Sequence, residues 1–232
     1  MQKKKTKMME IDQLQLKEII DSIKKIKENN DINIYNDDLK VAEEKISYLL
    51  DNSNHELKDY QSFLRAKKLF DTQIVNEEAG TFKALKKIHE YLFDGIYDYA
   101  GKIRDVNISK GNTRFASVIY IMDAIKEVEK MKQSNFEEII NKYIEMNIVH
   151  PFRDGNGRSM RIWLDMILKK ELNKCVDWSL VDKYNYLSAM ERSITNTLEI
   201  TELLKNALTD KINDRMIFIK GIEQSYYYET SD

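Results

Sequence analysis

Residues that can do phosphate chemistry gather within twelve positions near the middle of the chain. The segment HPFRDGNGRSMR, His150 to Arg161, combines a histidine, an aspartate and three arginines with two of the seven glycines and the one proline of the sequence. An imidazole can accept a proton, a carboxylate can hold Mg²⁺ beside phosphates, and guanidinium groups can bind phosphate oxygens. Together these residue types are suited to transferring a phosphate-linked group to a hydroxyl.

The histidine is the candidate base. Pro151 disfavours the α conformation of the residue before it, so the preceding helix is predicted to end at His150. An imidazole at a helix C-terminus meets the negative end of the helix dipole. We therefore expect the protonated form of His150 to be favoured, which would make it a better proton acceptor.

The turn after the histidine is predicted to bind an anion. Gly155 and Gly157 carry no side chains that would keep a ligand from the backbone, and the turn leads directly into a helix whose first N–H groups have no helical acceptor. Arg158 and Arg161 lie three residues apart and are expected to hold phosphate oxygens, while Asp154 is expected to hold Mg²⁺.

Each of these features also has an ordinary structural explanation. A histidine before proline often only ends a helix, helical arginines often form a solvated face, and GNG can be a simple turn. Their joint spacing is longer and less degenerate than a short motif, which favours a catalytic interpretation.

The rest of the chain predicts the helices that would position this segment. Few prolines and glycines interrupt it, and apolar residues recur at helical spacing. Ser134 and Glu137 form a capping-box pattern before the helix that leads to His150. We predict an all-α fold, with helices at 56–70, 79–93, 117–131, 134–149, 158–172, 180–193 and 199–208.

Two regions depart from this pattern. Residues 101–116, GKIRDVNISKGNTRFA, contain two glycines and short alternating runs, which predict a small β-hairpin or flap. Residues 1–56 end in a polar stretch and are interpreted as an appended helical segment of unknown role, which leaves 57–229 as the working domain.

Composition excludes several classes of protein. A net charge of −2 with 33% charged residues describes a solvated surface of mixed sign that requires neither nucleic acid nor lipid, and no apolar run reaches the ~20 residues that span a membrane. The single Cys175 predicts no internal disulfide, and the start has no signal peptide, so we expect a cytoplasmic protein.

The segment HPFRDGNGRSMR resembles the Fic family motif at every defined position. The similarity extends over about residues 57–229 and includes YDYAGKIRDVNISKGNTRFA and FEEIINKYIEMNIVHPF. It implies a Fic-fold helical bundle with a small β-hairpin flap. It also implies a protein adenylyltransferase, which moves AMP from ATP to a Tyr, Thr or Ser hydroxyl of a target protein.

The resemblance implies a role for each motif residue. His150 would deprotonate the target hydroxyl, Phe152 would anchor the loop, and Asp154 would bind Mg²⁺. ATP would be bound by Gly155, Asn156, Gly157, Arg158 and Arg161, with Arg161 on the γ-phosphate. Doc-type kinases carry lysine where this chain has Gly157. The flap would bind the target segment by strand addition through Lys110, Gly111, Asn112, Thr113, Arg114, Phe115 and Ala116.

The C-terminal residues resemble the inhibitory helix of stand-alone bacterial Fic proteins, class III. Ser225 and Glu229 lie four apart on a predicted helix at about 213–229, and the resemblance implies that Glu229 pairs with Arg161 and inhibits the enzyme. Thr230 stands where the pattern has Gly or Asn, and Thr6–Glu10 is a rival match. Tyr226 to Tyr228 suggest self-modification of this helix as a second hypothesis.

Two other functions remain open on the sequence. The same motif serves transfer of UMP or phosphocholine, and a chain locked by its own helix would be a non-catalytic binding module. The family resemblance suggests type II topoisomerase subunits as targets, and the sequence is compatible with a homo-oligomer.

Overall fold

The computed structural model describes residues 55–111 and 113–229. The chain divides between Leu64 and Arg65 into two units. In the first unit, the described residues 55–64 form the first part of helix α3 (His55–Lys68). Residues 1–54 of the predicted appended segment, the rival match Thr6–Glu10 and the flap residue Asn112 lie outside the described residues.

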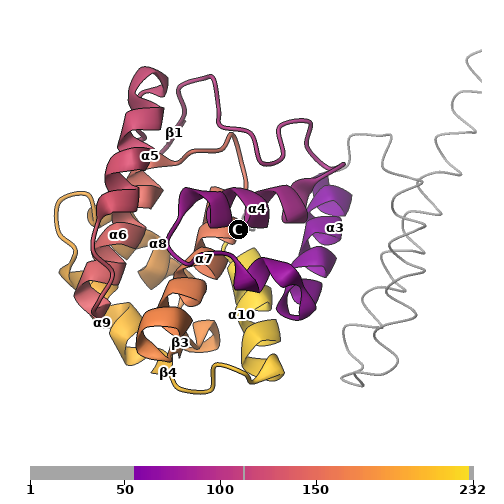
Figure 1. Ribbon diagram of the computed structural model, residues 1–232, viewed down its shortest axis with the longest axis vertical. Coiled ribbons are helices and arrows are strands. Elements are labelled where there is room, and N and C mark those ends of the chain that lie inside the picture. The colour runs from indigo at the N-terminus through magenta and orange to yellow at the C-terminus, as the bar shows by residue number, and fades with distance from the viewer. Residues whose placement is uncertain (1–54, 112, 230–232) are drawn as a thin grey trace, which may run out of the picture. The chain divides into compact units, whose positions relative to one another are not determined.

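The second unit is built around α7 (Asn156–Leu172), which packs against α4 (Phe82–Phe93) and α6 (Phe136–Val149) (Figure 1). The predicted apolar stripe of α7 is buried, as Met160, Trp163 and Leu168 illustrate. Burial extends beyond this stripe to Arg158 and Arg161, each 3% exposed. The helix is therefore enclosed, and its arginines do not form a solvated face.

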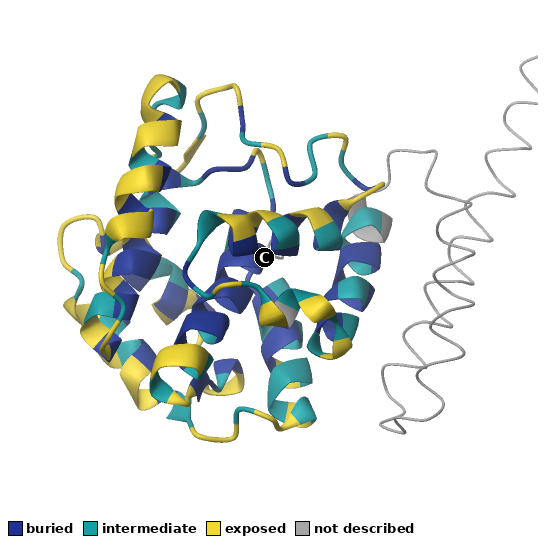
Figure 2. Cartoon of the chain, in the orientation of Figure 1, coloured by how far each residue is buried: buried dark blue, intermediate teal, exposed yellow. Residues whose placement is uncertain are grey.

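Shorter elements complete the described part of the chain, and the helix faces that are turned toward other helices carry the buried residues (Figure 2). None of the described helices is long and apolar enough to cross a bilayer. The all-α prediction is confirmed. The remaining helices are α5 (Ile121–Lys130), α8 (Lys183–Arg192), α9 (Leu198–Asn206) and α10 (Arg215–Tyr227), with 3-10 turns η1 (Leu69–Asp71), η2 (Gln73–Asn76), η3 (Val118–Tyr120) and η4 (Trp178–Leu180).

Two antiparallel pairs of very short strands interrupt the helices. Strands β1 (Ser109–Lys110) and β2 (Thr113–Arg114) form the predicted hairpin, with Ser109 opposite Arg114. Strands β3 (Cys175–Val176) and β4 (Leu208–Thr209) pair across the end of α7 and were not predicted. The β1–β2 hairpin is thus the predicted flap, and the β3–β4 pair is the other short interruption among the described helices.

Helix α6 begins one residue later than its predicted capping box. Asn135, not Ser134, is the N-cap, and its side chain accepts a hydrogen bond from the backbone N–H of Glu138 at 2.9 Å. The Glu138 carboxylate accepts the N–H of Ser134 at 2.8 Å in return. The acidic residue that completes this arrangement is therefore Glu138 and not Glu137, so the capping-box prediction was wrong in register.

Candidate active site

His150 lies at the C-terminal end of α6 in a left-handed conformation, with φ 49° and ψ 64°. Its ring stacks on Phe115, with the ring centroids 3.6 Å apart. Nδ1 lies 3.1 Å from the carbonyl oxygen of Asn147. Because a carbonyl oxygen only accepts, Nδ1 carries the proton in this contact and Nε2 keeps its lone pair. The helix therefore ends where Pro151 predicted, and the ring is oriented to accept a proton at Nε2.

The expectation that the helix end favours a protonated His150 is wrong. The pKa of His150 is lowered to about 4, mainly by burial and also by the cations Arg104 and Lys110, which together outweigh the hydrogen bond to Asn147. The imidazole is thus neutral near pH 7. A neutral ring is the form that can accept a proton. His150 is therefore a candidate base because burial keeps it neutral, and not because of the helix dipole.

The tight turn that follows requires glycine at its centre. Gly155 has φ 76°, and a Cβ there would lie 2.4 Å from the ring of Phe93. Its N–H donates to Asp154 Oδ1 at 2.6 Å, and the hydroxyl of Tyr97 donates to Asp154 Oδ2 at 3.2 Å. The Asp154 side chain remains 47% exposed, so its carboxylate is held in place yet open to a ligand.

The Asn156 side chain points into the protein. Its Oδ1 accepts the N–H of Phe152 at 2.9 Å and its Nδ2 donates to the carbonyl of Phe152 at 2.8 Å. The residue is 2% exposed. The Asn156 side chain thus closes the turn. The start of α7 can offer its backbone N–H groups to an anion.

His89 on α4 supports the same turn and was not singled out from the sequence. Its Nδ1 accepts the N–H of Gly101 at 2.9 Å, so Nε2 carries the proton and donates to the carbonyl of Asp154 at 2.8 Å. The ring stacks on Phe152 at 3.8 Å between centroids, and Phe152 is fully buried, as expected of an anchor. No local sequence pattern reveals this contact, since its partners lie 12 and 65 residues away.

Arg161 is bound by the end of α10. Its Nε donates to Ser225 Oγ at 2.7 Å, and its Nη2 donates to the Ser225 carbonyl at 2.8 Å and to Glu229 Oε1 at 2.7 Å. The guanidinium carbon also lies 5.1 Å from the centroid of the Tyr228 ring. The structure therefore brings together Arg161, Ser225 and Glu229, the three residues of the predicted inhibitory contact.

Charge stabilises this contact from both sides. Burial opposes ionisation of Glu229, but the Arg161 guanidinium holds the pKa of that carboxyl below its usual value. Burial likewise acts against the charge of Arg161, yet neighbouring tyrosines and Glu229 raise its pKa. A Cβ at Gly157 would lie 2.7 Å from Glu229 Oε1 and 2.9 Å from Arg161 Nη1. A side chain at position 157 would therefore displace the ends of the Arg161 and Glu229 side chains.

The flap approaches the same carboxylate. Lys110 Nζ lies 3.8 Å from Glu229 Oε2, although the Lys110 side chain is 71% exposed. The described flap residues Lys110, Gly111 and Arg114 are exposed, and Thr113, Phe115 and Ala116 are partly buried. Most of the hairpin is therefore available to a partner, while Phe115 contacts His150.

The residues present fit a magnesium ion only in company with phosphate. No group of three or more metal-binding side chains occurs in the described part of the chain. Mg²⁺ is commonly held by one or two carboxylates together with substrate phosphates. The half-exposed Asp154 beside the start of α7 meets that requirement.

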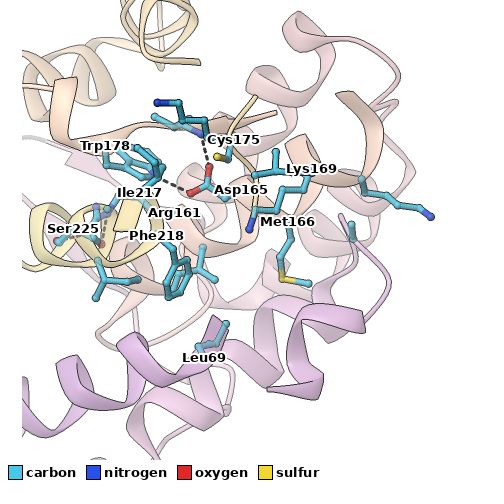
Figure 3. Close-up of a pocket in the computed structure, with 18 of the residues that line it drawn as sticks. Leu69, Arg161, Asp165, Met166, Lys169, Cys175, Trp178, Ile217, Phe218 and Ser225 are labelled. Carbon is cyan, nitrogen blue, oxygen red and sulfur yellow. Dashed lines mark hydrogen bonds between the residues drawn. The ribbon is translucent and has the colours of Figure 1, made fainter. Parts of the chain in front are cut away.

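A cavity of about 600 Å³ lies elsewhere, between α7 and α10 (Figure 3). Asp165, Lys169, Trp178 and Phe218 line it, and Arg161 and Ser225 reach one end of it. Neither His150 nor Asp154 contributes to its walls. Cavity volume alone therefore does not mark the residues that are suited to chemistry.

Sequence comparison finds similar proteins for this region. Residues 80–168 match the model of the Fic/DOC family. The protein adenylyltransferase VbhT of Bartonella schoenbuchensis is 31% identical over 155 residues, which cover 60% of this chain and 32% of that protein. The probable protein adenylyltransferase Fic of Escherichia coli is 34% identical over 94 residues, 36% of this chain and 47% of that protein. The matches thus span less than half of either relative.

Solved structures share the fold. The N-terminal Fic domain of an effector protein from Bartonella sp. AR 15-3 superposes with a TM-score of 0.58 at 18% identity, covering 70% of this chain and 86% of that one. A Fic domain from Bartonella quintana, solved with bound ADP, gives 0.55 at 18% identity, covering 68% and 88%. The helical frame around residues 80–168 is therefore a Fic fold.

Proposed function

We propose, from the Fic domain that this chain contains, that it transfers AMP from ATP to a Tyr, Thr or Ser hydroxyl of a target protein. One observation carries the proposal: a neutral, partly buried His150 stands directly before a turn that offers a half-exposed carboxylate and the first N–H groups of α7. Two relatives named as adenylyltransferases support it, as does the ADP bound to the Bartonella quintana domain.

The chemistry assigned to the protein's own residues is a single displacement. Nε2 of His150 accepts the proton of the target hydroxyl while that oxygen forms a bond to the α-phosphorus. The bond from the α-phosphorus to the bridging oxygen breaks, and pyrophosphate leaves with its electron pair. The backbone N–H groups of Asn156 and Gly157 would stabilise charge on the α-phosphate, joined by that of Gly155 once it leaves Asp154 Oδ1.

The charged side chains would bind the rest of the nucleotide. Arg158 and Arg161 would hold the outer phosphates, with Arg161 on the γ-phosphate, and Asp154 would hold Mg²⁺. The ion would supply charge neutralisation on the phosphates. In the structure Nη2 of Arg161 donates to Glu229 Oε1, so the carboxylate would compete with a phosphate for this guanidinium, which supports inhibition by α10.

The target is proposed to lie along the flap. Strand addition to residues 110–116 would place a backbone segment next to Phe115, which stacks on His150. Type II topoisomerase subunits are the candidate targets that the family suggests, and a cytoplasmic location would give access to them. A homo-oligomer is compatible with this arrangement.

We predict that Glu229→Gly raises AMP incorporation by about tenfold or more, because one charge-assisted hydrogen bond of ~1.5–3 kcal/mol no longer occupies Arg161. His150→Ala in the same background is expected to abolish incorporation. Radiolabelled ATP with a cell lysate measures both. Equal signals from the Glu229→Gly protein and from its His150→Ala derivative would refute the assigned roles.

The same Glu229→Gly protein separates the alternatives. A panel of labelled ATP, UTP and a phosphocholine donor distinguishes AMP transfer from the other group transfers. Binding of ATP without turnover by this variant would favour a non-catalytic module. Adenylyl mass on Tyr226, Tyr227 or Tyr228 would support self-modification, for which Tyr227 is exposed and Tyr228 is buried.

A further inference from the structure

Arg104 connects the flap to the motif loop through its whole guanidinium group. Its Nε donates to the carbonyl of His150 at 2.8 Å, and its Nη1 donates to the carbonyl of Val106 at 2.7 Å. Its Nη2 donates to the carbonyls of Ala116 and Val149, the latter at 3.2 Å. The residue is 2% exposed, so these contacts are made away from bulk water.

These carbonyls belong to two separate structures. Val106 and Ala116 lie on either side of the β1–β2 hairpin, while Val149 and His150 form the end of α6. Two backbone hydrogen bonds reinforce the junction: Arg104 N–H to the Pro151 carbonyl and Ala116 N–H to the Ile148 carbonyl, both at 2.9 Å. The flap therefore cannot shift relative to the base without breaking contacts to this one side chain.

The hydrogen bond from Arg104 reaches His150, a residue whose backbone conformation must be stabilised by its surroundings. A non-glycine residue with φ 49° is sterically disfavoured, and such residues persist where surrounding contacts hold them. The Arg104 hydrogen bond to the His150 carbonyl fixes the peptide plane that follows the histidine. The direction of the imidazole depends on that backbone.

We propose that Arg104 is the positioning residue that sets the location of a flap-bound target hydroxyl relative to Nε2 of His150. The inference rests on the proposed function for its catalytic meaning, and it assigns to Arg104 no contact with nucleotide or target. Only a planar group with five donors can bind all four carbonyls, so lysine cannot replace it even though it keeps the charge.

The activity test uses Arg104→Lys in the full chain carrying Glu229→Gly. The maximal rate of AMP incorporation is expected to fall on the order of 10²-fold, as misplacement by about 1 Å does elsewhere, while the KM for ATP changes less than about twofold. The matched control is Arg153→Lys. Arg153 lies in the loop between His150 and α7, is partly exposed, and pairs with Asp105, the residue that follows Arg104. An equal loss in the control, or a rise in KM alone, would overturn the proposal.

Arg104→Ala gives a second measurement. Guanidinium ion added at tens of millimolar, far below denaturing concentrations, is expected to restore part of the lost rate because it can reoccupy the donor site. Ammonium at the same ionic strength should not. Rescue by both ions alike would count against a requirement for the planar donor group.

Hydrogen exchange tests the coupling without any reaction. In Arg104→Lys with Glu229 intact, amides of residues 105–117 and 147–152 should exchange faster together by several-fold, with α4 and α9 unchanged. Faster exchange in the flap alone, no change, or an equal increase in every helix would overturn the proposal. No AMP incorporation by Glu229→Gly with Arg104 present would refute the proposed function and leave the exchange result to decide the coupling.

Discussion

His89 shows how a single buried side chain can support a catalytic loop without touching substrate. Both ring nitrogens are committed, one to Gly101 and one to the Asp154 carbonyl, and the ring is fully buried. Burial lowers the pKa of His89 to about 4. The histidine thus fixes the backbone of the residue proposed to hold Mg²⁺ and does so only in its neutral form.

This protonation state predicts acid sensitivity of the fold. The unfolded chain binds a proton at His89 near pH 6.5 and the folded chain only near pH 4, so stability is lost as pH falls through this window. From pH 7 to pH 5, His89 is expected to account for about 2 kcal/mol of the decrease in unfolding free energy. Urea unfolding of the wild type and His89→Gln at both pH values measures this share.

His89→Gln should be less stable at pH 7 but show a shallower pH dependence than the wild type. His150 titrates in the same range, since burial lowers its pKa to about 4 as well. The difference between the two slopes therefore isolates His89. Parallel slopes would contradict the assigned proton balance.

At the scale of elements, α6 carries His150 and its start fixes its register. Asn135 caps the helix, and the Glu138 side chain bonds back to Ser134. Helix α6 packs against α7 and α5, and Ile139, Tyr143 and Ile144 are among its buried residues. A well-defined start and a proline-determined end leave this helix little freedom to slide.

Asn135→Ala is expected to destabilise the protein by about 1 kcal/mol, since it leaves an N–H of the first turn without its side-chain acceptor. Ser134→Ala is the matched control and should cost much less, because only its backbone N–H takes part. Guanidinium chloride unfolding measures both. A larger loss from Ser134→Ala would restore the capping register that the sequence pattern suggested.

At the scale of the whole molecule, α10 is part of the core of the second unit. Tyr228 is 2% exposed, and its hydroxyl donates to the Val181 carbonyl at 2.8 Å. A Cβ at Gly221 would lie 3.2 Å from the ring of Trp178, so α10 packs closely on η4. The helix proposed to inhibit the enzyme is therefore also a structural element.

Deleting residues 213–232 should consequently differ from Glu229→Gly. Removal of α10 uncovers Trp178 and the apolar side of α7, and we expect a fall in Tm of more than about 10 °C or failure to fold. Glu229→Gly is expected to change Tm by only a few degrees. Thermal unfolding followed by circular dichroism compares them, and a stable, soluble truncated protein would show that α10 is dispensable for the fold.

Much of this architecture could be predicted because its signals are local. Apolar spacing located α6 and α7 within two residues at each end, and Pro151 predicted the end of α6 at His150. The contacts that were missed join distant residues: β3 meets β4 about 30 residues later, and Arg104 meets the His150 carbonyl. The pKa of His150 was misjudged because burial arises from the complete fold and not from the helix end alone.

The enclosure of Arg161 has an energetic consequence. Its side chain is 3% exposed, and Glu229 is the carboxylate that compensates its charge in the described part of the chain. Withdrawing Glu229 leaves Arg161 with its hydrogen bonds to Ser225 but without a compensating negative charge, which an incoming polyanion would supply. In the proposed mechanism, the Glu229 carboxylate would therefore occupy the position of a phosphate and compensate the charge of Arg161 while no nucleotide is bound.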